Sequence, residues 1–141
     1  MQMIFQDPMS SLNPRRRIQE TIAQPLLLFD NSRSKQQIRT AVNETLVRVG
    51  LAADFARRYP HELSGGQRQR VGIARAIALA PKLVIADEIV SGLDVSSQAT
   101  ILALLRELKD DLGLALIFIS HDLSVVRSMC DDVLVLSLIH I

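Results

Sequence analysis

The sequence predicts an α/β fold built on a parallel β-sheet, in a single domain of 141 residues. Two segments, residues 83–87 and 114–120, are almost entirely apolar and lack the alternation of a one-sided strand. Such runs are typical of parallel strands that are covered on both faces. Between them, residues 101–112 repeat leucine and isoleucine at helical spacing, with charged residues on the opposite side. Strand, helix and strand in this order form a crossover connection, which is expected to be right-handed.

The chain begins with a short apolar run, residues 1–5, which is expected to be the end of a strand. Asp7 and Pro8 then interrupt that strand. Residues 18–29 place apolar side chains at helical spacing, so a helix is expected there. Pro25 lies inside this helix and predicts a kink or a restart, because proline lacks an N–H and its ring collides with the preceding turn.

A second helical stripe runs from Ile38 to Val49, behind a cap at residues 31–34 and ahead of Gly50. Residues 51–58 predict a further short helix that stops before Pro60. Because helical patterns fill this stretch, residues 8–62 are expected to form a helical insert between two parts of the sheet domain.

Ser64 is predicted to cap the next helix, which Pro81 would end. The buried face of that helix would carry Val71, Ala74, Ile77 and Ala78. A last strand is expected at residues 133–136, where four apolar residues follow two aspartates.

The domain therefore divides into a helical subdomain, residues 8–80, and a sheet part formed by residues 1–7 and 81–137. We regard the tail, residues 138–141, as a candidate for non-native sequence.

Composition excludes several classes of function. The net charge is +1, aromatic residues make up 4% and tryptophan is absent, so neither charge nor stacking surface supports nucleic-acid binding. The single cysteine, Cys130, allows no internal disulfide and fits a reducing compartment. No apolar run reaches the roughly 18 residues that span a bilayer, so any membrane connection is expected to come through a partner protein.

Two groups of residues indicate nucleotide chemistry. Ser64, Gly65 and Gly66 open a helix, where free N–H groups and the helix dipole favour a phosphate and glycine permits close approach. Asp87 and Glu88 directly follow a buried strand, where one carboxylate could hold a metal and the next could orient a water. An ordinary helix cap and a solvated strand end are the alternative interpretations of each group taken alone.

Taken in order along the chain, these motifs resemble the ATP-binding subunit of ABC transporters. The matching segments are the Q-loop glutamine Gln6, the signature motif Leu63–Gln67, the Walker B strand Leu83–Glu88, the D-loop Ser91–Asp94 and the switch histidine within Ser120–Asp122. Residues 5–14 and 59–62 are most similar to the branch that imports oligopeptides, dipeptides and nickel. The resemblance implies a P-loop NTPase-like fold of three layers, with the parallel core sheet and the inserted helical subdomain.

One motif of this family is absent. No Gly-x-x-x-x-Gly-Lys-Ser/Thr segment occurs, so the Walker A loop that cradles phosphate is not encoded in these residues. The family places that loop upstream of Gln6, and the chain is accordingly expected to be an N-terminally truncated fragment. The missing strand would lie between residues 114–120 and 132–136. We therefore expect the sheet order 1–5, 83–87, 114–120, with residues 132–136 misplaced or loosely held.

The resemblance also implies roles for individual residues. Glu88 would polarise the attacking water and His121 would sense the γ-phosphate. Asp87 and Gln6 would hold Mg²⁺, directly or through water. Further contacts to ATP are implied for Ser64, Gly65, Gly66, Gln67 and Asp94, with the signature gripping ATP bound to the opposite subunit.

The implied partners are ATP, a second nucleotide-binding subunit and the transmembrane permease subunits, and no nucleic acid. The subunit would lie on the cytoplasmic face of the membrane, held there by the permease. The implied function is ATP hydrolysis that drives import of peptides or nickel, although the residues present would be inactive alone because Walker A is absent. The basic cluster Arg15–Arg17 is either a solvated helix start or a contact to the permease.

Two other classes of function stay open. Soluble ABC ATPases of DNA repair or translation share the motifs, and the chain could also be a non-catalytic remnant. Two positions depart from the importer pattern: Ile89 stands where proline usually follows Glu88, and Gly92 where alanine is common. The first removes a residue with a fixed φ beside the proposed base, which leaves the loop geometry open.

Overall fold

The computed structural model describes residues 1–7, 11–30 and 32–136. The strands are β1 Gln2–Ile4, β2 Leu83–Asp87 and β3 Ala115–Ile119. The α-helices are α2 Ile18–Phe29, α3 Lys35–Arg48, α4 Gly65–Ile77, α5 Val95–Leu112 and α6 Leu123–Met129. Two short 3₁₀ helices, Ala53–Arg57 and Pro60–Glu62, connect α3 to α4.

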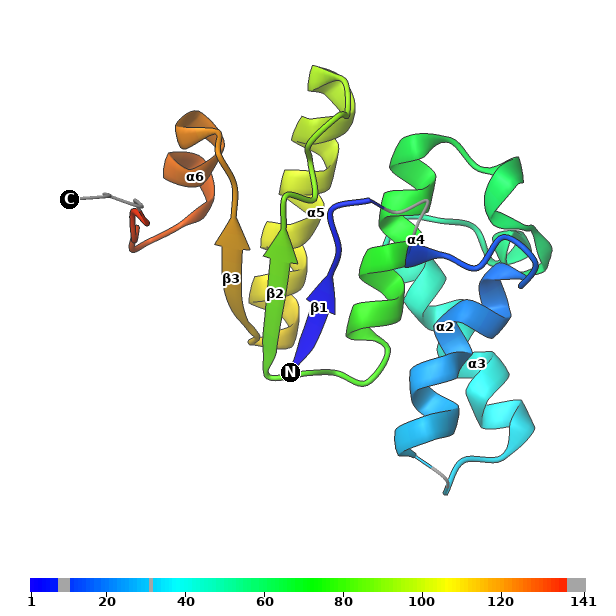
Figure 1. Ribbon diagram of the computed structural model, residues 1–141. Coiled ribbons are helices and arrows are strands. Elements are labelled where there is room, and N and C mark those ends of the chain that lie inside the picture. The colour runs from blue at the N-terminus through cyan, green and yellow to red at the C-terminus, as the bar shows by residue number, and fades with distance from the viewer. Residues whose placement is uncertain (8–10, 31, 137–141) are drawn as a thin grey trace.

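The sheet is parallel and has the order β1-β2-β3, which confirms the strand order expected from the sequence (Figure 1). Ile4 lies opposite Ala86, and Asp87 lies opposite Ile119. Because all three strands point the same way, their carboxyl ends meet at one edge of the sheet.

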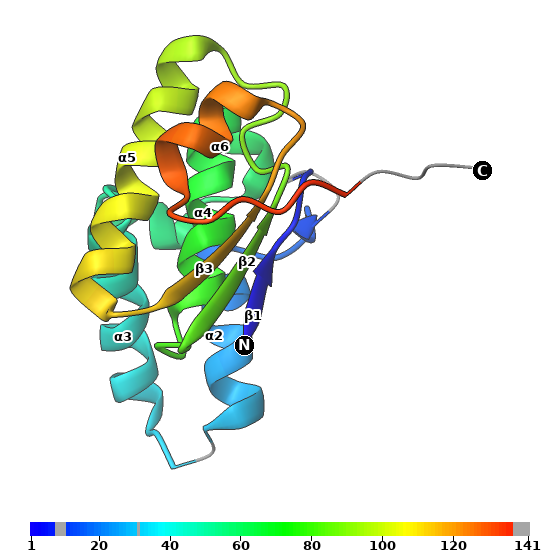
Figure 2. The same cartoon turned by 90° about the vertical axis from the view of Figure 1, so that its left-hand side faces the viewer.

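Helices pack against one face of this sheet, and α4 and α5 lie on the same side of it (Figure 2). Ile4, Val84 and Ala86 point into that core and are at most 2% exposed. The opposite face is open in the described part of the chain: Ile117 and Ile119 on β3 remain 49% and 45% exposed. The sheet therefore buries one face against helices, while its other face presents apolar side chains to solvent.

The helical insert contains α2 and α3, which pack side by side and against α4, away from β3 (Figure 1). The prediction for residues 18–29 is confirmed, but the helix does not restart at Pro25, because one continuous helix spans that residue. Ser34 caps α3, with its hydroxyl accepting from the Gln37 N–H at 3.3 Å. The predicted short helix at residues 51–58 is a 3₁₀ helix.

The helix that connects β2 to β3 has clear end signals. Asp94 caps α5 at its start, and Gly113 ends it in the left-handed region at φ +58°. Its leucine and isoleucine stripe, Ile101, Leu104, Leu105 and Leu108, is buried as the sequence predicts.

The strand predicted at residues 133–136 does not form. These four residues have no regular secondary structure, pair with no strand and are 52–87% exposed. The strand that the resemblance places between β3 and this segment is not among the three described strands, so residues 133–136 have no neighbour at pairing distance, and an apolar run alone makes no strand. This agrees with the expectation that residues 132–136 would be misplaced or loosely held. Pro8, Asn31 in the predicted α3 cap and the tail 138–141 lie outside the described residues.

Among residues 1–7, 11–30 and 32–136, no helix combines the length and the hydropathy that a membrane span requires.

Candidate functional site

Three of the residues singled out from the sequence follow the carboxyl ends of the three parallel strands. Gln6 lies two residues after β1, Glu88 directly after β2 and His121 two residues after β3. In parallel α/β sheets, ligands bind outside this edge, because the loops there converge and no strand obstructs them. The edge therefore brings together residues from three distant parts of the sequence.

Glu88 and His121 contact each other directly. The two carboxylate oxygens of Glu88 lie 2.9 and 2.8 Å from His121 Nδ1. The backbone N–H of His121 also donates to Glu88 Oε1 at 3.1 Å, so both the ring and the main chain hold the carboxylate. The Glu88 side chain is 20% exposed, whereas that of His121 is 76% exposed. The pair is thus a partly shielded carboxylate covered by an exposed imidazole.

This contact changes the titration of the histidine. The hydrogen bond to Glu88 and its negative charge raise the pKa of His121 above the usual histidine range, and Asp122 adds to the same effect. A protonated His121 would donate Nδ1–H to the carboxylate and keep Nε2–H for another acceptor. The arrangement can therefore hold a proton at the edge of the sheet.

The backbone at Glu88 is unusual. Its φ is +50°, which few non-glycine residues adopt, and its N–H donates to the Ile119 carbonyl at 3.0 Å. The next two residues, Ile89 and Val90, are 1% and 3% exposed and belong to the core. The Gln98 side chain donates to the Val90 carbonyl at 3.0 Å. Ile89, which departs from the importer pattern, therefore anchors the turn by burial where proline would stiffen it by its ring.

No hydrogen bond joins the side chains of Asp87 and Gln6, so their contacts alone do not define a metal site. Asp87 ends β2 and is partly buried, and Gln6 is exposed. Within the described ranges, no cluster of three or more histidine, cysteine, aspartate or glutamate residues could hold a metal ion alone. A carboxylate at this position does suit Mg²⁺, which keeps several waters and takes one or two protein carboxylates together with phosphate oxygens.

The signature segment forms a capped helix start. The Ser64 hydroxyl accepts from the Gln67 N–H at 3.3 Å, and the Gln67 side-chain oxygen accepts from the Ser64 N–H at 2.9 Å. Among the residues that the structure describes, this reciprocal pair leaves the N–H groups of Gly65 and Gly66 without an acceptor at the start of α4. A helix start with two free donors can bind an anion.

Crowding inside the chain does not require glycine at either position. A Cβ on Gly65 would lie 3.7 Å from Leu93, and one on Gly66 would lie 3.8 Å from Ser97, both at ordinary contact distance. Neither glycine has a positive φ. What glycine provides here is open access to the backbone N–H groups from outside the chain.

Asp94 lies beside this helix start. Its carboxylate accepts from the Ser97 N–H at 2.9 Å and from the Ser97 hydroxyl at 2.6 Å, and these bonds lower the pKa of Asp94 below its usual range. Since Ser97 also lies next to Gly66, the D-loop residue and the signature helix share one surface. Leu93 beside Gly65 extends that surface.

A protein-family model for ABC transporters matches residues 1–91 of the chain. The chain belongs to the ABC transporter family. That match covers β1, the insert, the signature helix and β2, and ends after the turn that holds Ile89 and Val90.

Relatives and solved structures agree with this assignment. The chain is 54% identical over 140 residues to the oligopeptide transport ATP-binding protein OppF of Escherichia coli K12, covering 99% of this chain and 42% of that protein. The dimeric structure of MJ0796, a bacterial ABC transporter cassette, superimposes with a TM-score of 0.76 at 33% identity, covering 90% of this chain and 54% of that one. The same cassette in a post-hydrolysis state, bound to ADP and Pi, gives a TM-score of 0.75 at 33% identity over 89% and 53%.

The chain thus spans less than half of the E. coli relative, and about half of the MJ0796 cassette. The ABC transporter fold predicted from the motifs is confirmed, including its parallel core and inserted helices.

Sequence reasoning missed several residues that shape the site. Ser97 and Gln98 support Asp94 and the Glu88 turn, and Arg68 donates at 2.8 Å to the carbonyl of Leu63, the first residue of the signature. The spacing of Asp94 and Ser97 is a helix-start signal that could have indicated the first of these contacts. The other two depend on the way the chain folds back, and no local pattern predicts them.

Proposed function

We propose that the chain is part of an ATP-hydrolysing subunit of an ABC importer and contributes the water-activating and phosphate-sensing residues. The observation that carries this proposal is the contact between Glu88 and His121 beside Asp87 at the carboxyl edge of the sheet. A carboxylate that is held in place and adjoins a histidine can orient and polarise a water. The unpaired donors of Gly65 and Gly66 supply the second half of a phosphate site.

In this function the chain's residues act in distinct ways. Glu88 accepts a proton from the water that attacks the γ-phosphate, an effect commonly worth about 10²–10⁴ in rate. His121, which is largely exposed, donates to a γ-phosphate oxygen and thereby reports that the phosphate is present. Ser64, Gly65 and Gly66 contact the γ-phosphate of ATP held by the second subunit.

Mg²⁺ would be held by Asp87, with Gln6 bonding through water, and would neutralise charge on the phosphate oxygens. The fit rests on a partly buried carboxylate at the end of β2 with no cation bound to it by an ion pair in the described ranges. Gln67 and Asp94 would lie close to the nucleotide on the shared surface of the signature helix and the D-loop.

The activity is tested in the longer protein that carries a phosphate loop ahead of Gln6. Glu88→Gln should abolish ATP hydrolysis and leave nucleotide binding intact, because the amide cannot accept a proton from water. Glu107→Gln, an exposed glutamate on α5, is the matched control and should retain activity. Residues 1–141 alone should show no magnesium-dependent turnover. Hydrolysis by the Glu88→Gln variant at the wild-type rate would disprove the proposed role of Glu88.

The solute is proposed to be a peptide, since the E. coli relative is named as an oligopeptide transport protein. Nickel is the other substrate implied by the branch. The alternative of a soluble ABC ATPase gains no support from that relative. A peptide-uptake assay in cells that produce the complete transporter distinguishes peptide from nickel transport.

Two kinds of partner follow from this function. A second nucleotide-binding subunit would complete each site, and the dimeric structure of the MJ0796 cassette supports the expectation of a dimer. The permease subunits would hold the protein at the cytoplasmic face of the membrane. No nucleic acid is expected as a partner.

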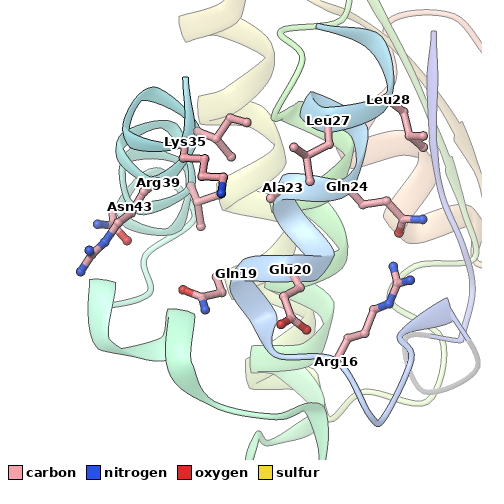
Figure 3. A pocket seen from close by; sticks show the side chains of 12 residues that line it. Arg16, Gln19, Glu20, Ala23, Gln24, Leu27, Leu28, Lys35, Arg39 and Asn43 are labelled. Atoms are coloured by element: carbon pink, nitrogen blue, oxygen red, sulfur yellow. The ribbon is translucent and has the colours of Figure 1, made fainter. Parts of the chain in front are cut away.

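The insert offers a surface for the permease. A groove of about 980 Å³ lies between α2 and α3, with Ala23, Leu27 and Ile38 among its apolar lining. Ala23 and Leu27 on α2 turn towards α3, and Lys35 reaches between the two helices (Figure 3). Leu27 is 56% exposed, and the next two residues, Leu28 and Phe29, are 63% and 74% exposed, so several apolar side chains face solvent together at the end of α2.

The basic cluster Arg15–Arg17, interpreted from the sequence as either a solvated helix start or a permease contact, does not act as one unit. Arg17 is used internally: its Nε donates to the Tyr59 hydroxyl at 3.4 Å and its guanidinium lies over the Tyr59 ring. Arg16 instead lines the groove. Charge reversal at Arg16 should therefore weaken assembly with the permease, whereas reversal at Arg17 should first destabilise the fold. Crosslinks from the permease to residues 95–136 alone would contradict this placement.

A further inference from the structure

Three arginines of the signature helix α4 donate to backbone carbonyls in three other segments. Arg68 bonds the Leu63 carbonyl at 2.8 Å, Arg70 the Val49 carbonyl at 2.5 Å and Arg75 the Ser11 carbonyl at 2.7 Å. Within the described ranges none of the three forms an ion pair with a carboxylate. The guanidinium groups therefore hold backbone segments in position and do not neutralise a carboxylate.

The Arg75 contact links two segments that both carry proposed nucleotide ligands. Arg75 lies near the end of α4, whose first turn holds the signature glycines, and its partner Ser11 is 64 residues earlier. The Ser11 N–H donates in turn to the Asp7 carbonyl at 3.1 Å, which is adjacent to Gln6. A short path of hydrogen bonds therefore runs from α4 to the residue that follows Gln6.

The surroundings make this contact strong. Arg75 is partly buried in a cavity that Phe5, Gln24 and Ile85 also line, and burial lowers the pKa of its guanidinium, which nevertheless stays charged. A charged donor that has lost water gains more from its remaining hydrogen bond than an exposed one. Leu12, the residue after Ser11, is 2% exposed and anchors the same segment in the core.

We propose that Arg75 is a positioning residue that ties the loop carrying Gln6 to α4, so that Gln6 and the signature move as one rigid unit. From Ser64 to Arg75 the helix spans roughly 16 Å at about 1.5 Å per residue. A displacement of the Gln6 loop by nucleotide or permease would therefore be carried along α4 to the phosphate-binding start of the helix. The tether itself depends only on the contacts described; its consequence for ATP rests on the proposed function.

The tether is tested first without nucleotide, by hydrogen exchange on residues 1–141. Arg75→Ala should speed exchange of the Ser11 amide by about tenfold, because a hydrogen bond to a charged group is lost from its carbonyl. Arg75→Lys, which keeps a cationic donor, should restore part of the protection. Arg106→Ala is the matched control, since Arg106 donates to the Ser128 carbonyl elsewhere in the fold.

Amide hydrogen exchange of the β2 residues shows whether Arg75→Ala acts only on the Ser11 segment or loosens the whole fold. Unchanged exchange at Ser11 in Arg75→Ala, or an equal acceleration of Ser11 and β2, would overturn the tether. The urea midpoint of each variant is measured alongside, so that a general loss of stability is recognised.

The consequence for catalysis is tested in the longer, active protein by a double-mutant cycle. Arg75→Ala should lower kcat by about tenfold with KM nearly unchanged, because the side chain of Arg75 is bonded to the Ser11 carbonyl and has no proposed role in binding ATP. If Arg75 acts through Gln6, the combined Gln6→Ala and Arg75→Ala variant should be no worse than Gln6→Ala alone. Additive losses would overturn the coupling. If the wild-type protein did not hydrolyse ATP, the proposed function would be refuted. The hydrogen-exchange experiment would then decide alone whether Arg75 holds the Gln6 loop against α4.

Discussion

Ile89 should determine the stability of the turn that presents Glu88. Its side chain is 1% exposed and packs in the core directly after a residue at φ +50°. Ile89→Ala removes three carbon atoms from that core and leaves a cavity. Changes of this kind cost about 2–5 kcal/mol, a large share of the roughly 5–15 kcal/mol by which a typical domain is stable.

Urea unfolding followed by circular dichroism measures this loss. Ile117→Ala is the matched control, because the same residue type on β3 is 49% exposed. With about half of its side chain already in water, its loss should cost roughly 1 kcal/mol. Ile89→Val, which removes one methyl group, should cost about 0.5–1.5 kcal/mol.

A second readout connects stability to the site. If the burial of Ile89 holds Glu88 in place, Ile89→Ala should also lower the pKa of His121 towards its ordinary value, as histidine NMR signals would report. Equal losses of stability in Ile89→Ala and Ile117→Ala would refute the claim that Ile89 anchors the turn.

Three further predictions follow from contacts in the structure. Glu88→Gln should lower the pKa of His121, as measured by NMR. Because this pKa is raised in the folded protein, the contribution of the contact to folding stability should be fully present below the ordinary histidine pKa and should be lost as the pH rises through the pKa of the folded state. Gly92→Ala should lower the free energy of unfolding by about 1–2 kcal/mol, because Gly92 has φ +76°. Gly72→Ala, inside α4 with open space where its Cβ would lie, should raise the free energy of unfolding by roughly 0.5–1 kcal/mol. Thermal unfolding measures both, and changes in the same direction would contradict this reasoning. Ser64→Ala should cost about 1 kcal/mol by loss of the α4 cap, and Ser64→Asp, which can still accept from the Gln67 N–H, should not.

Local sequence patterns predicted the regular elements well. The limits of α2 and the buried stripe of α5 follow from apolar spacing, and the caps at Ser34 and Ser64 follow from residue type. These features depend on neighbours within one turn, which the sequence lists directly. The failure at residues 133–136 has the opposite cause, because a strand forms only where another strand offers hydrogen bonds.

For the site, the sequence placed Glu88 and His121 directly after two predicted strands, and the structure brings the two side chains into contact. The roles assigned to them, and to Asp87 and Gln6, stay predictions. The sequence contained no indication that Ile89 is buried or that Arg75 reaches Ser11.

The sequence by itself determined the family, the parallel sheet and the candidate residues, because motifs and hydrophobic periods are local properties of the chain. Only the tertiary structure decided that Glu88 pairs with His121 across 33 residues, and that the signature helix is tied to the loop after β1. Both contacts join groups that the sheet and helices bring together at long separation. Their geometry depends on the packing of every element between them, which no local pattern encodes.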